Sequence, residues 1–218
     1  MKRFFIYLML YLFIGVFNVA AAALGTLKPI VQQELKALSV ITDLPTPAFI
    51  WTLEKQRSSK GKRNLIEQFS GSMNGLPDIT TIETREAKES IRQRLSVRGL
   101  MDVDAKDSTL GLKLFGLMVP VTPGAKFSFE LTRDNRTVTK ECLARERQAA
   151  GNLHPMMTGL IVPISCTGSG SYHGVMIKST SELAWIESLN MFLPLSEVAD
   201  TPLGVFTEST RILNFELR

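Results

Sequence analysis

The sequence predicts an α+β fold. A mainly antiparallel β-sheet, sandwich-like or shaped as a half-barrel, is expected in the C-terminal half of the chain, with one or two helices from the N-terminal half packed on it. Two observations predict this division. Apolar residues recur every three or four positions over residues 27–42 and 80–97, which indicates amphipathic helices. From residue 111 onward they alternate at every second position, which indicates strands with one buried face.

Residues 1–23 have the layout of a secretory signal peptide. Lys2 and Arg3 form a positively charged start, an almost unbroken apolar run follows, and residues 20–23 are four alanines that offer cleavage frames. We therefore expect cleavage near Ala23 and a periplasmic or extracellular protein. Because the apolar run up to Ala23 is about 20 residues long, roughly a bilayer span, an uncleaved N-terminal anchor is the alternative.

The length and charge of residues 24–218 limit the size of the domain and the kinds of partner that we expect. About 195 residues can bury the core of a single domain, which we divide into a helix-bearing part (24–108) and a β-rich part (109–218). The formal net charge of +4 falls to about +2 when Lys2 and Arg3 leave with the leader, and acidic and basic residues are interspersed. Such a mild charge argues against nucleic acid as a partner.

The helix-bearing part begins with an expected helix over residues 27–42, with Pro29 in its first turn. Residues 48–53 alternate large apolar side chains with smaller or polar ones, which predicts a strand. Residues 64–69 fit a helical turn or a short strand equally well. Residues 71–78 are rich in residues that break helices and strands, and indicate a loop.

Residues 80–97 are expected to form the clearest helix. Thr80 and Glu83 have the spacing of a capping box. Gly99 offers a stop signal just beyond the segment. The arginines and lysines between its apolar positions indicate an outer face in water, with the apolar face on the sheet.

A basic segment lies between the first expected strand and residue 64. Its charged members are Lys55, Arg57, Lys60, Lys62 and Arg63. The segment is interpreted as a solvated loop. The alternative is a binding surface that touches anionic lipid headgroups or cell-envelope polymers through charge alone, which would give a peripheral membrane contact.

The β-rich part opens with alternating apolar residues over 112–121, and the phase of the alternation changes near Gly116. A glycine at that point predicts a β-bulge. Residues 127–131 and 137–143 alternate cleanly, and Asp134-Asn135 between them predicts a tight hairpin connection.

Residues 160–166 return to strict alternation, interrupted by Pro163. Because proline lacks the N–H needed for a ladder hydrogen bond, we expect an edge strand or a bulge there. Residues 167–171 read Thr-Gly-Ser-Gly-Ser and predict a turn. A strand over residues 172–177 is expected to follow.

The pattern of residues in the last fifth of the chain predicts a short helix and two strands. Ser179 and Glu182 have capping-box spacing, with apolar residues behind them that indicate a helix up to about Leu189. Strands are expected over residues 205–207 and 211–217.

Cys142 and Cys166 are the only cysteines of the chain. Each is in phase with the buried face of its own expected strand, which predicts a disulfide inside the core. If the protein is exported, a disulfide is expected in place of two free thiols, because disulfides persist in oxidising compartments. In the chain-entropy description, closing a loop of about 25 residues stabilises the fold by roughly 3–4 kcal/mol.

A search for catalytic signatures returns weak candidates only. His173 and His154 are the two histidines, and Ser169 and Ser171 lie in the glycine-serine segment near His173. The sequence holds no HExxH, CxxC or GxSxG motif, and nothing in it predicts a metal or a cofactor.

Three functions remain open at this level. The first is an exported, non-catalytic binding or assembly protein of the cell envelope that contacts a protein or polymer partner, with a sheet edge as the docking place. The second is a secreted or periplasmic hydrolase that uses a histidine near residues 168–171. The third is an accessory factor tethered by an uncleaved N-terminal anchor.

Overall fold

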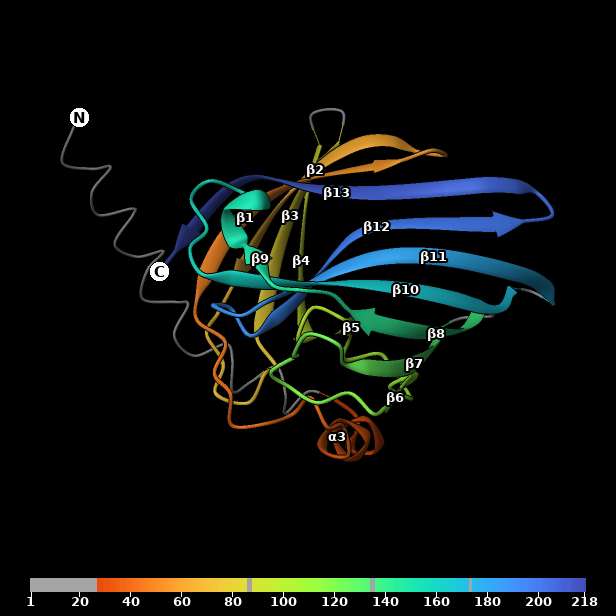
Figure 1. Ribbon diagram of the computed structural model, residues 1–218, viewed down its shortest axis with the longest axis horizontal. Coiled ribbons are helices and arrows are strands. Elements are labelled where there is room, and N and C mark those ends of the chain that lie inside the picture. Colours follow the sequence, from red (N-terminus) through yellow and green to blue (C-terminus); the bar gives the residue numbers. More distant parts are fainter. Residues whose placement is uncertain (1–26, 86–87, 134–135, 173) are drawn as a thin grey trace.

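One antiparallel sheet makes up most of the protein (Figure 1). The computed structural model describes residues 27–85, 88–133, 136–172 and 174–218; the predicted leader and His173 lie outside these residues. The elements are α3 (Pro29–Lys36), β1 (Phe49–Arg57), β2 (Gly61–Phe69), β3 (Asp78–Arg85), β4 (Lys88–Val97), β5 (Met101–Val103), β6 (Leu112–Phe115), β7 (Lys126–Arg133), β8 (Arg136–Ala144), β9 (Gln148–Ala149), the 3-10 helix η1 (Ala150–Asn152), β10 (Leu160–Tyr172), β11 (Val175–Ile186), β12 (Met191–Thr201) and β13 (Gly204–Leu217).

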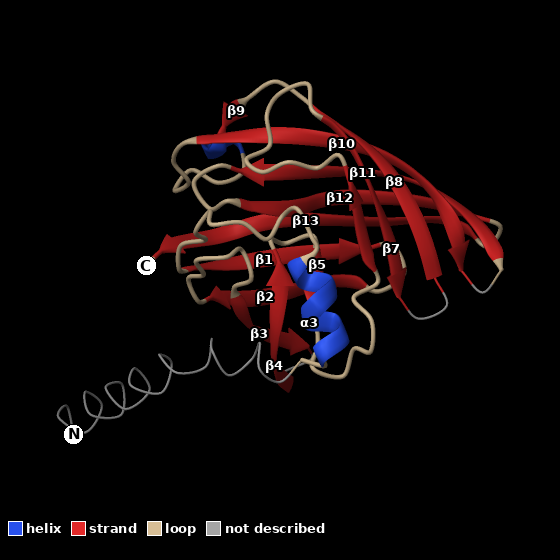
Figure 2. Cartoon of the chain, turned by 90° about the horizontal axis from the view of Figure 1, so that it is seen from below, coloured by secondary structure: helices blue, strands red, loops and turns tan. Residues whose placement is uncertain are grey.

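The strands follow the order β5-β4-β3-β2-β1-β13-β12-β11-β10-β8-β7-β6, and β9 is a short partner of β10. The first long strand, β1, pairs with the last, β13, and this pairing joins an N-terminal and a C-terminal series of antiparallel strands. The sheet curls into a nearly closed, barrel-like shape (Figures 1 and 2). This confirms the predicted class, a mainly antiparallel sheet, sandwich-like or half-barrel, with helix from the N-terminal half packed on it. The sheet is not confined to the C-terminal half, because it also contains β1 to β5.

The helix predicted over residues 27–42 exists but is shorter, Pro29–Lys36, with the proline in its first turn. Val31 and Leu35 are buried on its inner side, in a core that also contains Phe127 of β7 and Trp185 of β11. Figure 1 shows α3 at the end of the molecule where β5, β6 and β7 lie. Among the residues described, no helix is long and apolar enough to cross a membrane.

The prediction of a helix over residues 80–97 is wrong, because this segment forms the hairpin of β3 and β4. Ile82 lies opposite Ile91, and Ile91 is exposed, so the apparent helical stripe is not a buried face. The run Ile-Thr-Thr-Ile at residues 79–82 is β-branched throughout, which favours extended backbone. Sheet pairing overrides the capping-box spacing.

The predicted turn at residues 167–171 and the predicted helix starting at Ser179 are also wrong. Strand β10 continues through the glycine-serine segment to its end at residue 172. Strand β11 contains both Ser179 and Glu182, which lie opposite Gly168 and Ser165 of β10. A glycine within a strand marks a place where another group approaches closely, and Gly168 is such a place.

The basic segment is a hairpin and not a loop. Lys55 and Arg57 belong to β1, Lys62 and Arg63 belong to β2, and Lys60 lies in the turn between them. Residues 64–69, which the sequence left between helix and strand, continue β2. The strand predicted over residues 48–53 is confirmed as the first part of β1.

Smaller differences concern strand ends. Strand β6 stops at Phe115, and Gly116 has a φ of +70°, so the chain leaves the sheet where a bulge was expected. The two strands predicted over residues 205–217 are one strand, β13. Pro163 lies inside the sheet, opposite Ala184 of β11. On the other side of β10, the neighbouring strand changes from β9 to β8 near this residue. The Pro163 carbonyl accepts a hydrogen bond from Arg145 N (2.7 Å) as β8 ends.

Candidate binding site

The predicted disulfide is confirmed. Cys142 of β8 and Cys166 of β10 lie directly opposite each other, with an S–S distance of 2.01 Å and a Cα–Cα distance of 4.1 Å. Both residues are buried in the core that includes α3. The bond joins two strands that are already hydrogen-bonded, so it fixes their register. Because disulfides persist mainly outside reducing compartments, it indicates a non-cytoplasmic location, consistent with an exported protein.

Charged side chains from four strands meet on the same, concave face of the sheet as the disulfide. We call this set the ionic belt. Its members are Arg57 of β1, Arg136 and Lys140 of β8, Glu197 of β12 and Glu208 of β13. Glu197 and Glu208 lie directly opposite each other on β12 and β13, and Arg57 lies opposite Glu208 on β1. The register of three neighbouring strands thus brings these carboxylates and a guanidinium into one row.

Lys140 is the buried member of the belt. Its Nζ donates to Glu197 Oε1 at 3.0 Å and to Ser181 Oγ at 3.1 Å. Arg136 Nη2 reaches the same carboxylate oxygen at 3.3 Å. Only 9% of the Lys140 side chain is exposed, compared with 43% for Arg136 and 33% for Glu197. Glu208 has its own partner, because Arg57 Nε donates to it.

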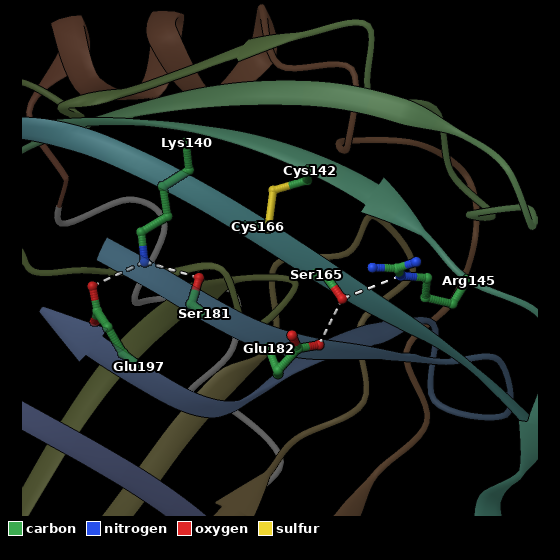
Figure 3. Close-up of a disulfide and its surroundings, with 8 residues drawn as sticks. All are labelled: Lys140, Cys142, Arg145, Ser165, Cys166, Ser181, Glu182 and Glu197. Atoms are coloured by element: carbon green, nitrogen blue, oxygen red, sulfur yellow. Dashed lines mark hydrogen bonds and ion pairs between the residues drawn. A yellow bond between two sulfur atoms is a disulfide. The ribbon is translucent and has the colours of Figure 1, made fainter. Parts of the chain in front are cut away.

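Gly168 explains how a lysine of β8 reaches β11 and β12. It is the residue of β10 directly opposite Lys140. A Cβ on Gly168 would lie 2.9 Å from Lys140 Cγ and 3.0 Å from Ser179 Oγ, so any larger residue would meet the lysine side chain. Figure 3 shows Lys140 extending past the disulfide toward Ser181 and Glu197. The glycine therefore opens the path across β10 that the lysine occupies.

A cavity of about 440 Å³ opens beside the belt. Besides the charged groups and several hydroxyls, apolar side chains from five parts of the sheet line it: Leu100, Met101, Phe129, Leu131, Val138, Leu183 and Pro194. Phe129, Val138 and Leu183 are buried. The cavity thus combines an apolar wall with a charged and partly exposed row.

A second cavity of about 180 Å³ shares Leu100, Met101, Asp102 and Pro194 with the first. A buried polar network lines it. It consists of hydrogen bonds from Trp51 Nε1 to Glu67 Oε2 (2.8 Å) and from Arg94 Nη2 to Glu67 Oε1 (2.9 Å), and of an ion pair between Arg94 and Asp102 (2.8 Å). Arg94 and Glu67 have nearly buried side chains that neutralise each other. This network ties β1, β2, β4 and β5 together.

A larger depression of about 620 Å³ lies over β7, β8 and β10, and it is an open surface. Many of its residues, including Glu141, Arg145 and Thr167, are exposed. Arg145 Nε donates to Ser165 Oγ (3.3 Å), which donates in turn to Glu182 Oε2 (3.0 Å; Figure 3). Water reaches these groups freely, so the more enclosed cavity at the belt is the better candidate for selective binding.

Most of the basic hairpin is neutralised within the protein. Arg57 pairs with Glu208, Lys62 Nζ with Glu54 (3.3 Å) and Arg63 Nη1 with Glu83 (3.5 Å). For Lys55 and Lys60, the described chain offers no carboxylate within ion-pair distance. The hairpin as a lipid- or polymer-binding surface stays a prediction, and Arg57 contributes to the belt.

Of the catalytic candidates that the structure describes, His154 lies far from Ser169 and Ser171. His154 follows η1, and its Nδ1 accepts a hydrogen bond from Met156 N (3.3 Å). Ser169 and Ser171 lie in the far half of β10, roughly 30 Å along the strand from Leu160, near which His154 is placed. A histidine cannot activate a hydroxyl at that separation. His173 lies outside the described residues, and those described hold no cluster of potential metal ligands.

Lys140 and Ser181 have the separation of a serine–lysine pair, but their surroundings do not fit catalysis. A serine nucleophile needs a neutral amine as its base. Glu197 lies 3.0 Å from Lys140 Nζ and forms an ion pair with it. The amine is therefore engaged with a carboxylate as well as with the hydroxyl.

One signal of the belt was present in the sequence. Lys140 lies between Val138 and Cys142 in strict alternation, so the predicted buried face contains a lysine, and a buried lysine requires a partner. No local pattern points to that partner, because Glu197 lies 57 residues further along the chain. Comparisons with protein-family models, with curated proteins and with solved structures found no match.

Proposed function

We propose that the protein is an exported, non-catalytic binding protein of the cell envelope or the extracellular space, and that its ligand or partner occupies the concave cavity at the ionic belt. The observation that supports this most directly is the pair of buried Lys140 and half-buried Glu197 on the wall of a 440 Å³ cavity. Its volume lies in the range of sites that bind small molecules or a side chain of a partner.

The energetics of the belt favour a role in binding over a role in stability. Removing an ion pair from water costs about as much as the pair regains, so apolar residues would fill the same space with equal or greater stability. The neighbouring positions Val138, Cys142 and Leu183 are apolar and pack well. Ionised side chains that do not increase the stability of a core are expected at sites where they bind a ligand.

Docking of a partner strand on a sheet edge is less well supported than binding in the cavity. The strands at the two ends of the sheet, β5 and β6, are three and four residues long. An added strand draws its affinity from a long row of main-chain hydrogen bonds, and such short edges supply few of them. The hydrolase alternative lacks an assembled base and nucleophile among the described residues.

Site-specific photocrosslinking in cells tests the proposed function. A photoreactive amino acid replaces Thr210, which lines the cavity, and in a second variant it replaces Ser209, the exposed neighbour that is not part of the cavity wall. Because the two residues are adjacent in β13, the variants differ mainly in the face from which the probe projects. We expect adducts in the envelope or secreted fraction from position 210 only. Equal labelling from both positions, or none from position 210, would contradict the proposal.

A further inference from the structure

We infer that the cavity binds a single-chain amphiphile with a monoanionic headgroup, whose headgroup lies at Arg136 and Lys140 and whose chain lies on the apolar wall. This inference rests on the proposed function and names the ligand class of the same site. Three features support it: the charge balance of the belt, the donors that it leaves free, and the order in which polar and apolar groups line the cavity.

The belt carries one more positive than negative charge. Arg57 and Glu208 form one pair, whereas Arg136 and Lys140 share a single oxygen of Glu197. Asp102, the other acid on the wall, shares Arg94 with Glu67, and Lys55 of the adjoining cavity offsets the negative charge that remains. The two cavities together therefore also hold one more cationic than anionic side chain. An incoming group with one negative charge would complete the balance, whereas a cation would add to the excess.

The two cations at Glu197 also retain hydrogen-bond donors. An ammonium has three donors, and Lys140 uses two of them, for Ser181 and Glu197. A guanidinium has five donors, and the bond from Arg136 to Glu197 uses one. Carboxylate and phosphate oxygens are the acceptors that such groups bind most strongly. Both side chains line the cavity.

Polarity changes with depth in the cavity. Arg57, Arg136, Glu197 and Glu208 keep about a third or more of their side chains exposed. Phe129, Val138 and Leu183 on the same wall are almost fully buried. Lys140 is nearly buried and Arg136 is partly exposed, so a headgroup that contacts both lies where the open, charged side meets the buried wall, and its chain lies against that wall.

Titration calorimetry on the purified, disulfide-bonded protein tests the inference with four probes of similar chain length, each below its micelle concentration. These are dodecanoate, a 12-carbon lysophosphatidylglycerol, dodecyl maltoside and dodecyltrimethylammonium. We expect the two anions to bind at least tenfold more tightly than the neutral and cationic probes. The tighter anion indicates whether the natural source is a free fatty acid or a lipid headgroup. Equal binding of all four probes, or no binding of either anion, would overturn the inference.

Two variants locate the headgroup. Arg136→Gln removes one cation and leaves Glu197 paired with Lys140, so we expect affinity for the tighter anion to fall about tenfold and affinity for dodecyl maltoside to stay the same. The matched control is Arg145→Gln, an equal loss of charge from an exposed arginine in the open depression; it should leave both affinities unchanged. Equal losses in the two variants would mean that net charge, and not this site, attracts the anion, and would overturn the inference.

Chain burial has its own test. Leu131 lines the cavity and is only partly buried, so Leu131→Trp can occupy the space without replacing a core residue. We expect this variant to weaken dodecanoate at least fivefold while retaining the thermal stability of the parent protein. Unchanged dodecanoate affinity would overturn the inference.

The outcomes separate the two proposals. Photocrosslinks from position 210 to a protein, without amphiphile binding, would overturn the ligand class and support binding at the concave face. Anion binding that depends on Arg136, together with adducts to a lipid or a protein from position 210 only, would support both. The absence of crosslinks from position 210 together with the absence of amphiphile binding would overturn both.

Discussion

Gly168 and Lys140 lie directly opposite each other on β10 and β8, and the lysine side chain crosses the strand at the glycine. The bonds from Lys140 Nζ to Ser181 and Glu197 both depend on this crossing. A segment that looked like a flexible glycine-serine turn is therefore the central part of a long strand. Its composition reflects the close passage of a charged side chain.

Gly168→Ala should destabilise the protein by about 1–3 kcal/mol, the range for overpacking a close contact. The new Cβ would meet Lys140 Cγ and the Thr139 carbonyl oxygen, both at 2.9 Å. Urea unfolding measures the change. The matched control is Gly151→Ala, because no atom lies within 4 Å of a Cβ at that position. A loss as large at Gly151 as at Gly168 would contradict this account.

Removing the disulfide with Cys142→Ser and Cys166→Ser should lower the free energy of unfolding by about 2–4 kcal/mol. The cysteines close a loop with a sequence separation of 24 residues, and the unfolded chain gains freedom when the bond is absent. Denaturation with and without a reductant measures the effect. The reductant should reproduce the loss in the parent protein and have no effect on the variant; an effect on both would point to another target.

Arg98 is a buried arginine whose role the sequence did not reveal. Its guanidinium donates to the carbonyl oxygens of Val40 (2.5 Å), Asn190 (3.0 Å) and Leu44 (3.0 Å) and to Thr42 Oγ1 (2.9 Å). It thereby ties the chain before β1 to the turn before β12. Burial lowers the pKa of this guanidinium to about 10.

Arg98→Met should cost about 3–5 kcal/mol, because three carbonyl groups and a hydroxyl lose their donor inside the protein. Arg98→Lys should recover little of this, because an ammonium cannot reproduce the planar arrangement of donors. Thermal unfolding checks both variants. Arg92→Met provides the contrast, since Arg92 is half exposed and its ion pair with Asp104 is worth at most about 1 kcal/mol. Similar losses at both arginines would refute this role for Arg98.

Asp78 gives a pH dependence with a defined sign. Burial raises the pKa of this carboxyl from 3.8 to about 6. The folded state therefore favours the protonated acid, and the contribution of Asp78 to stability is greatest below about pH 4 and is lost as the pH rises to about 6. The carbonyl of the same residue accepts a hydrogen bond from Ser70 N (3.0 Å), which a change of side chain leaves intact.

Asp78→Asn should accordingly be more stable than the parent protein above pH 6 and nearly equal to it at pH 4. Because the group is partly exposed, we expect a difference of about 1 kcal/mol at pH 7, well below the value that the full shift would give. Urea midpoints across this range provide the measurement, with Glu146→Gln at an exposed loop position as the control. A difference that does not depend on pH would contradict the assignment to Asp78.

The errors made from the sequence have a common cause. The segments of residues 80–97 and 179–189 both begin with a threonine or serine followed three residues later by glutamate, the spacing of a helix start. In the structure, Glu83 and Glu182 each lie opposite a residue of another strand. A capping pattern stabilises a helix by only about 1 kcal/mol, and pairing along a whole strand exceeds that amount. The β-branched run at residues 79–82 was the local signal that favoured the strand.

By itself, the sequence determined the mainly antiparallel class, the helix at residues 29–36 within its predicted range, and the faces on which Cys142 and Cys166 meet. The fold class, the helix and the buried faces follow from the local spacing of apolar residues. The disulfide follows because the chain has only two cysteines. Only the tertiary structure decided that β1 pairs with β13 and that Lys140, Glu197 and Glu208 share one cavity wall. Alternation specifies which face of a strand is buried, but it does not specify the neighbouring strand. The Arg57–Glu208 pair spans 151 residues, so only the curling of the complete sheet brings such charges together.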